Sequence, residues 1–283
     1  MTPDHPTHPA APALAARLAA LFAELPAVVA VALGGSLASG AADDASDIDL
    51  YVYTRGDVPL SAREAIVERS GGASRADLGL TYWGPGDEWF DAATGIEVDV
   101  VYFAAGWMAE QLRRVLVDHA PGLGYTTCFW HTVRASRPLH DPEGWLAALQ
   151  AQAATPYPEP LRQAIIAHNH PVLRGIIPSY RTQLAKALGR DDAVSANHRL
   201  AALLAGYFDI VFAANRVPHP GEKRLVERAA ALCPSLPPHM AADVAATLAA
   251  AGVCSPATLT HLDRLLDRLD AWLKSELNTD SHG

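Results

Sequence analysis

Two short motifs near the N-terminus combine residue types that can bind phosphate and a divalent metal. Gly34-Gly35-Ser36 follows a short apolar run, and ten residues separate its serine from Asp47-Ile48-Asp49. Glycine lets backbone N–H groups approach a phosphate closely, and the serine hydroxyl adds another donor. Paired carboxylates can hold a divalent metal against a nucleotide triphosphate. The spacing of these residue types therefore points to phosphoryl-transfer chemistry.

Strand alternation places the carboxylates on one side. Residues i and i+2 of a strand face the same way, with Cα atoms about 6.5–7 Å apart, so Asp47 and Asp49 can converge on one or two Mg²⁺ ions. In two-metal phosphoryl transfer the ions lie about 3.5–4 Å apart. A third carboxylate on a neighbouring strand would complete the metal site or accept a proton. Asp99, in the alternating run 96–103, meets this need, and Glu97 lies on the same face.

Hydrophobic periodicity predicts the elements that must position these motifs. It predicts strands over 27–33, 47–53, 78–83 and 96–103, and helices over 13–24, 61–70 and 107–119. Ser61 is expected to cap its helix, with Glu64 at the capping-box position. From Trp145 onward the pattern is helical.

We place a domain boundary between about residues 141 and 158, where the character of the pattern changes. The prediction is α/β (α+β), with a disordered N-terminus over 1–12, a catalytic α/β domain over 13–145 and an all-helical domain over 146–283. The clearest helix of the second domain carries one apolar stripe formed by Leu262, Leu265, Leu266, Leu269, Trp272 and Leu273.

Composition argues against nucleic acid and membrane partners and against a disulfide or zinc framework. The net charge of −9 argues against a duplex nucleic acid partner, which would require a basic face. No apolar run reaches the ~20 residues that span a bilayer. The three cysteines are widely spaced, without a CxxC pattern, which disfavours a disulfide framework or a zinc site and fits a reducing cytoplasm. We therefore expect a cytoplasmic protein without nucleic acid or membrane partners; the sequence leaves its oligomeric state open.

The segment Tyr82–Asp91 combines aromatic rings with three acids, at Asp87, Glu88 and Asp91. Aromatic faces and carboxylates both attract ammonium groups, so the segment suits a cationic acceptor. The alternative is a loop anchored by its tryptophans on its own domain, and the sequence does not decide between the two.

Gly35-Ser36, the ten-residue spacing and Asp47-Ile48-Asp49 resemble the signature of the DNA polymerase β-like nucleotidyltransferase superfamily. The motif match covers residues 27–103. The helical C-terminal half resembles antibiotic nucleotidyltransferases, such as those that modify aminoglycosides or lincosamides. The resemblance implies a mixed sheet flanked by helices, two Mg²⁺ ions and an NTP, with ATP expected. It also implies an enzyme that transfers a nucleoside monophosphate to a hydroxyl of a small acceptor, for instance an antibiotic, and releases pyrophosphate.

Carried over to this sequence, the resemblance assigns metal binding to Asp47, Asp49 and Asp99. Asp99 is then also the expected general base. Some streptomycin-type members have the glutamate two positions earlier, which would give the base role to Glu97. We favour Asp99 because its register places it in the middle of the strand, and the choice stays open at this point.

The nucleotide-binding residues expected from the resemblance are Gly35, Ser36 and Ser46. The helical half should close over the nucleotide. Lysine occurs only three times in the chain, so Lys186 and Lys223 are the candidates there for binding phosphate. Tyr180 and Arg181 lie near Lys186 on an expected helix that could present one face to a triphosphate. A solvated helix or loop surface is the alternative for both.

Two alternatives to a small-molecule enzyme remain. Minimal members of the superfamily modify a protein partner in toxin–antitoxin pairs, and some partners carry an Arg-x(4–6)-His motif. This chain matches that motif at Arg162–His168 and again at Arg114–His119, which shows how unspecific it is. The other alternative is a nucleotide-binding protein without catalysis, which the three intact acidic positions disfavour.

Overall fold

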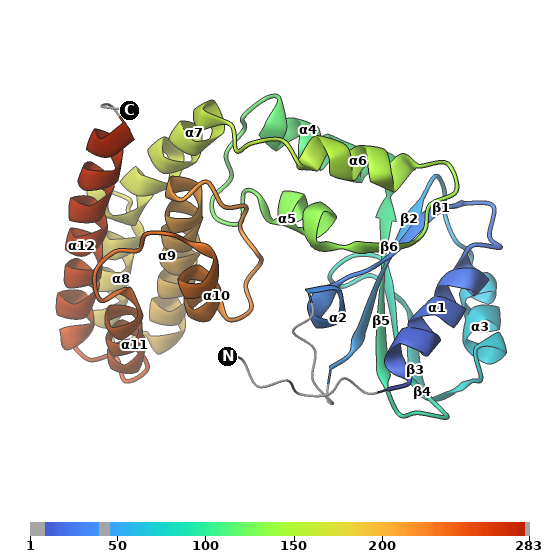
Figure 1. Cartoon of the computed structure of the whole chain (residues 1–283). Coiled ribbons are helices and arrows are strands. Elements are labelled where there is room, and N and C mark those ends of the chain that lie inside the picture. The colour runs from blue at the N-terminus through green and yellow to red at the C-terminus, as the bar shows by residue number, and fades with distance from the viewer. Residues whose placement is uncertain (1–8, 40–45, 281–283) are drawn as a thin grey trace. The chain divides into compact units, whose positions relative to one another are not determined.

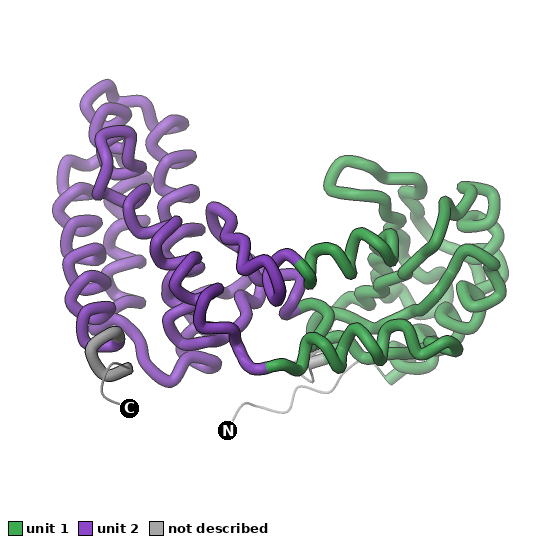
Figure 2. The backbone as a smooth tube through the Cα atoms, turned by 90° about the horizontal axis from the view of Figure 1, so that it is seen from above, with its two compact units in different colours: residues 1–113, 132–155 green, residues 114–131, 156–283 purple. Residues whose placement is uncertain are grey.

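A computed structural model describes residues 9–39 and 46–280 of the chain. The chain forms two compact units, one of residues 1–113 with 132–155 and one of residues 114–131 with 156–283 (Figure 2). The segment 114–131 thus belongs to the helical unit although it lies between two parts of the first. The predicted functional domains, 13–145 and 146–283, stay predictions, because compactness alone does not test what each part does.

The first unit contains a sheet and the helices around it (Figure 1). Its elements are α1 (Ala11–Phe22), β1 (Val28–Leu33), α2 (Gly35–Ser39), β2 (Ile48–Thr54), α3 (Leu60–Arg69), β3 (Ala73–Leu80), β4 (Gly86–Asp91), β5 (Glu97–Ala104), α4 (Ala105–Leu116), β6 (Arg137–His140) and α6 (Trp145–Ala153). The last three residues of α4 extend into the second unit, and α5 (Cys128–Ala135) spans the boundary at residues 131 and 132.

The described residues form one six-stranded sheet in the order β3-β4-β5-β2-β1-β6. β2 and β5 run parallel and the other neighbours run antiparallel, so the sheet is mixed, as predicted. One face packs on α1 and α3 through Ile48, Leu50, Val98 and Val100, all of which are fully buried. The alternate residues of β2 and β5 therefore point to the opposite face.

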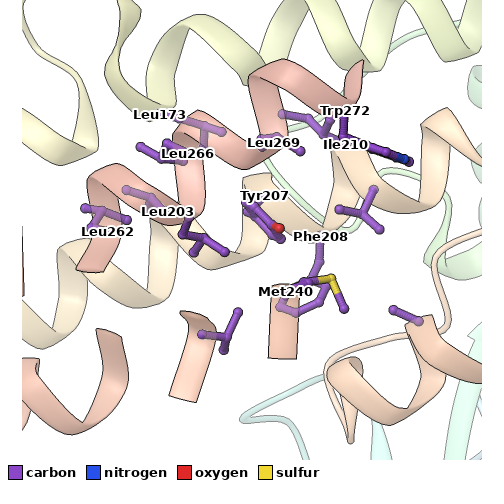
Figure 3. Packing of buried hydrophobic residues seen from close by; sticks show 14 of the residues in the cluster. Leu173, Leu203, Tyr207, Phe208, Ile210, Met240, Leu262, Leu266, Leu269 and Trp272 are labelled. Atoms are coloured by element: carbon purple, nitrogen blue, oxygen red, sulfur yellow. The ribbon is translucent and has the colours of Figure 1, made fainter. Parts of the chain in front are cut away.

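The second unit is helical, as predicted. It comprises α7 (Glu159–His170), a π-helical segment η1 (Pro171–Gly175), α8 (Tyr180–Leu188), α9 (Ala193–Ala214), α10 (Leu225–Leu232), α11 (Met240–Ala251) and α12 (Ala257–Asp280). The predicted apolar stripe of α12 is buried along its whole length. It packs against α9, whose Leu203, Tyr207 and Ile210 lie in the same cluster (Figure 3). Among the helices of the described residues, none combines the length and apolar character needed to cross a bilayer.

Three local predictions were wrong. α3 begins one residue earlier than expected, and its N-cap is Pro59 rather than Ser61, because the Pro59 carbonyl accepts the Ala62 and Arg63 N–H groups. The strand expected over 78–83 ends at Leu80, and the segment expected to be a loop is strand β4 from Gly86 onward. The short strand β6 was not predicted at all. Of the N-terminal stretch expected to be disordered, residues 1–8 lie outside the described residues and α1 begins at Ala11.

A buried polar cluster fixes the segment 122–127 inside the helical unit. The side chain of Asp209 on α9 accepts hydrogen bonds from the Thr126 backbone N–H (3.0 Å), the Thr126 hydroxyl (2.6 Å) and the Asn169 amide (3.3 Å). Asn169 in turn accepts from the Gly124 N–H and donates to the Gly122 carbonyl. Asp209 is only 1% exposed, and burial raises its pKa to about 6 against the lowering effect of its donors.

The raised pKa of Asp209 predicts a specific pH dependence of stability. The folded chain keeps a proton on Asp209 up to about pH 6, whereas the unfolded chain releases it near pH 4. The stabilising contribution is therefore fully present below about pH 4 and is lost as the pH rises through 6, by about 3 kcal/mol. We expect the free energy of unfolding of wild type minus that of Asp209→Asn to fall by this amount between pH 4 and pH 7. Urea denaturation measures it, with the exposed Asp191→Asn as control; a constant difference would contradict the assignment.

Candidate active site

The parallel register of β2 and β5 places two of the predicted acids side by side. Asp49 and Asp99 are direct register partners on strands whose backbones lie about 4.8 Å apart. Both side chains are half-buried, and both belong to the face opposite α1 and α3, since Leu50 and Val100 next to them are buried against those helices. The structure thus brings the two carboxylates together.

The remaining predicted residues of this region lie at or just before the N-terminal ends of the same two strands. Asp47 directly precedes β2 and is half-buried, as is Ser46. Ser46 follows the segment 40–45, which lies outside the described residues. Glu97 is the first residue of β5, is exposed, and pairs in register with Phe90 of β4.

The Tyr51 hydroxyl reports how closely the acids converge. Tyr51 lies on β2, two residues beyond Asp49 and on the same face. Its pKa is raised to about 12, first by burial and then by the negative charges of Asp49, Asp99 and Asp47. Three carboxylates from two strands and the preceding loop therefore act on one point.

The Gly-Gly-Ser turn packs directly on the acids. Gly34 donates its N–H to the Asp49 carbonyl (2.8 Å), and α2 begins at Gly35. Gly35 has a φ of +57°, and a Cβ at this position would lie 1.7 Å from Asp49 Oδ2. No side chain larger than hydrogen fits there. Ser36 follows at the start of α2, half-buried.

The donors of this region fit magnesium. Carboxylate oxygens are the hard ligands that Mg²⁺ takes, together with water and phosphate oxygens. Among the described residues, no three Asp, Glu, His or Cys side chains are grouped with the spacing of a preformed metal site. The register of Asp49 with Asp99 places the two acids side by side on adjacent strands, from which both side chains would reach one ion.

Sequence reasoning missed one acid of this face. Glu88 on β4 is the register partner of Asp99, so the row Asp49, Asp99, Glu88 crosses three adjacent strands. Asp77 on β3 continues the row, and its carboxylate pairs with Arg75. The signal that could have found Glu88 is the alternation of β4, in which every second residue is buried.

The other two acids of the segment 82–91 are structural, so the expectation that all three attract a cation was wrong. Asp87 is buried and accepts from the Gly79 N–H (2.7 Å) and the Tyr102 hydroxyl (2.6 Å). Asp91 is buried and accepts from the N–H and hydroxyl of Thr94. Trp89 is buried as well, whereas Trp83 is 90% exposed, so only one of the two tryptophans anchors the segment, and it does so from strand β4 rather than from a loop.

The predicted lysines lie in the helical unit. Lys186 is exposed on α8, and Lys223 is exposed in the turn before α10. Arg181, expected near Lys186 on a face open to triphosphate, is instead held by Asp263 through two hydrogen bonds of 2.6 Å. The contact of either lysine with a nucleotide stays a prediction, because each unit is described by itself.

Comparison with known proteins matches part of the chain to a family of domains. Residues 16–118 match the family model of the nucleotidyltransferase domain. No curated protein matches the chain. Among solved structures, it is similar to a nucleotidyltransferase-like protein from Exiguobacterium sibiricum, at 14% identity over 91% of this chain and 72% of that chain, with a TM-score of 0.41.

Residues 16–118 are therefore similar to a nucleotidyltransferase domain. The matched segment includes every residue of the sheet site described above, from Gly34 to Asp99. The prediction of an enzyme that transfers nucleotidyl groups is confirmed at this level.

Proposed function

We propose that this chain transfers AMP from ATP, with Mg²⁺, to a hydroxyl of a small amine-bearing acceptor and releases pyrophosphate. An antibiotic is one acceptor of this kind. The observation that carries the proposal is the register of Asp49 with Asp99 beneath the Gly34–Ser36 turn. Carboxylates that lie directly against a tight glycine turn suit the binding of a metal-bound triphosphate.

The proposed roles follow from the positions of the side chains. Asp47, Asp49 and Asp99 would hold the metal, which supplies Lewis-acid stabilisation of the charge that develops on the phosphate oxygens. Ser36 would donate to the terminal phosphates. Asp99 would accept the proton of the acceptor hydroxyl, whose oxygen attacks the α-phosphorus while pyrophosphate leaves on the opposite side.

Charge favours a cationic acceptor. Glu88 and Glu97 lie on either side of the site, one on the neighbouring strand and one at the start of β5. Neither is needed to hold phosphate, which carries the same sign of charge. An acceptor that brings amines to these carboxylates would be favoured over a neutral one.

The test is a transfer assay with α-labelled nucleotides. Purified protein, Mg²⁺ and each of ATP, GTP, CTP and UTP are incubated with a panel of hydroxylated amines, including aminoglycosides, and with neutral polyols. We expect label on an amine-bearing small molecule, with one pyrophosphate released per transfer, and its mass shift identifies the nucleotide. Product analysis by mass spectrometry separates the outcomes.

Two results would contradict the proposal. Label on a co-encoded protein with none on small molecules would indicate the protein-modifying alternative. Nucleotide binding without transfer to any acceptor would indicate a non-catalytic protein. Within this chain, the match at Arg162–His168 does not favour a ribonuclease-type motif, because Arg162 is buried and ion-paired to Glu159 (2.6 Å).

A further inference from the structure

Tyr51 is the aromatic side chain of β2 that lies beside Asp49 against the glycine turn. It is half-buried, pairs in register with Ala32 of β1 and Val101 of β5, and follows Asp49 on the same face. Its ring meets Phe103 edge-on, with centroids 5.6 Å apart. Packing against the strand therefore fixes the ring in place.

The ring lies directly over Gly34. A Cβ on Gly34 would lie 2.4 Å from two ring carbons of Tyr51 and 2.6 Å from its hydroxyl oxygen. These distances are far inside van der Waals contact, so Gly34 is required to be glycine by the tyrosine and not by its own backbone conformation. Gly35 differs, since its constraint comes from Asp49 and from a positive φ.

The Tyr51 hydroxyl also engages the turn. The Gly35 backbone N–H lies close enough to the Tyr51 hydroxyl to lower its pKa, and the Gly34 N–H donates to the Asp49 carbonyl. The Gly34 N–H is therefore committed within the protein. The Asp49 carbonyl holds the turn through the Gly34 N–H, and the Tyr51 ring packs against Gly34.

We propose that Tyr51 is a positioning residue of the nucleotide site. Its hydroxyl and ring fix the Gly34–Ser36 turn, so that Ser36 meets the terminal phosphates. The inference rests on the proposed function, since it assigns the turn to phosphate binding. Tyr51 touches the turn and not the reacting atoms, so its loss should weaken nucleotide binding more than it slows the chemical step.

The first measurement is the binding of a non-hydrolysable ATP analogue with Mg²⁺ by calorimetry, without acceptor. Tyr51→Phe keeps the ring and removes the hydroxyl, and we expect about 5-fold weaker binding, the size of one lost neutral hydrogen bond. In turnover, KM for the nucleotide should rise by the same factor while kcat changes less than about twofold. Tyr53→Phe is the matched control, since it removes a hydroxyl from the same strand and face. Tyr53 lies two residues beyond Tyr51, and its ring contacts Phe103 and Trp145.

The second measurement is a double-mutant cycle. Gly34→Ala should weaken binding by about 10-fold or more in wild type, because the new methyl overlaps the Tyr51 ring. In a Tyr51→Ala background the same change should cost less than about twofold. Gly35→Ala serves as control, since its overlap with Asp49 persists in either background.

The outcomes separate the two proposals. If wild type binds no nucleotide analogue, the proposed function fails, whatever Tyr51 does. If wild type binds and Tyr51→Phe binds equally well, or if Gly34→Ala costs the same in both backgrounds, the positioning role is overturned. Should Tyr51→Ala not fold, Tyr51→Leu supplies the background for the cycle, and the Tyr51→Phe measurement is unaffected.

Discussion

Asp49→Asn is expected to lower the rate of nucleotidyl transfer at least about 10³-fold while leaving the protein folded. A bound metal contributes several kcal/mol of charge stabilisation in the transition state, and 10³-fold corresponds to about 4 kcal/mol. Asp49 lies next to Asp99 and against Gly35, so it is the most constrained carboxylate of the site. Asparagine has nearly the same shape but not the charge that the metal requires.

Asp49→Asn should not lower the stability of the protein. Removing one of two neighbouring negative charges relieves repulsion in the metal-free protein, so the melting temperature of Asp49→Asn should equal or exceed that of wild type. The matched control is Asp57→Asn, which changes an exposed carboxylate in the loop after the same strand and should keep full activity. Wild-type transfer by Asp49→Asn, measured as pyrophosphate release at saturating Mg²⁺, would contradict the metal-site proposal.

The sequence predicts the centre of the sheet well, because its two middle strands alternate cleanly. Ile48, Leu50 and Val52 are buried on one face, and Asp49 and Tyr51 lie on the other. Alternation sets the face of each side chain, and apolar burial sets the register by which Asp49 meets Asp99. The face on which Asp49 and Asp99 lie could therefore be predicted from the pattern alone.

Strand β4 could not be predicted, because it breaks the rule that buried residues are apolar. Asp87 and Asp91 are buried on β4, where each has donors from other parts of the unit. A pattern with acids at the buried positions is typical of a loop, so β4 was missed and Glu88 with it. Only the pairing with β5 shows that Glu88 stands opposite Asp99.

The helical unit shows a different limit of sequence reasoning. The stripe of α12 is a property of one element and was predicted correctly. The partners of Arg181 and Asp209 lie 82 and 83 residues away along the chain, on other elements. Periodicity within a helix carries no information about such partners, which is why Arg181 was expected at the nucleotide rather than on Asp263.

The choice of general base gives the second large expected effect. Asp99 is half-buried beside Asp49, whereas Glu97 is exposed at the start of β5 and stands opposite Phe90. A base must lie within reach of the acceptor hydroxyl when that hydroxyl faces the α-phosphate, and the metal-binding acids set where that phosphate lies. If Asp49 holds the metal, Asp99 next to it is the acid that would meet both requirements from one position. We therefore expect Asp99→Asn to lower the single-turnover rate about 10³-fold or more, and Glu97→Gln to lower it less than about 10-fold.

Single-turnover transfer with saturating Mg²⁺ and nucleotide separates these effects from product release. Glu88→Gln is the matched control on the other side of Asp99. As an acceptor contact it should raise the KM for a cationic acceptor and leave the single-turnover rate at saturation within about threefold. A 10²-fold loss in Glu97→Gln together with a mild Asp99→Asn would transfer the base role to Glu97. Such a result would also require the acceptor to bind near the N-terminal end of β5. A base at the first residue of that strand reaches only a hydroxyl that lies beyond the row formed by Asp49, Asp99 and Glu88.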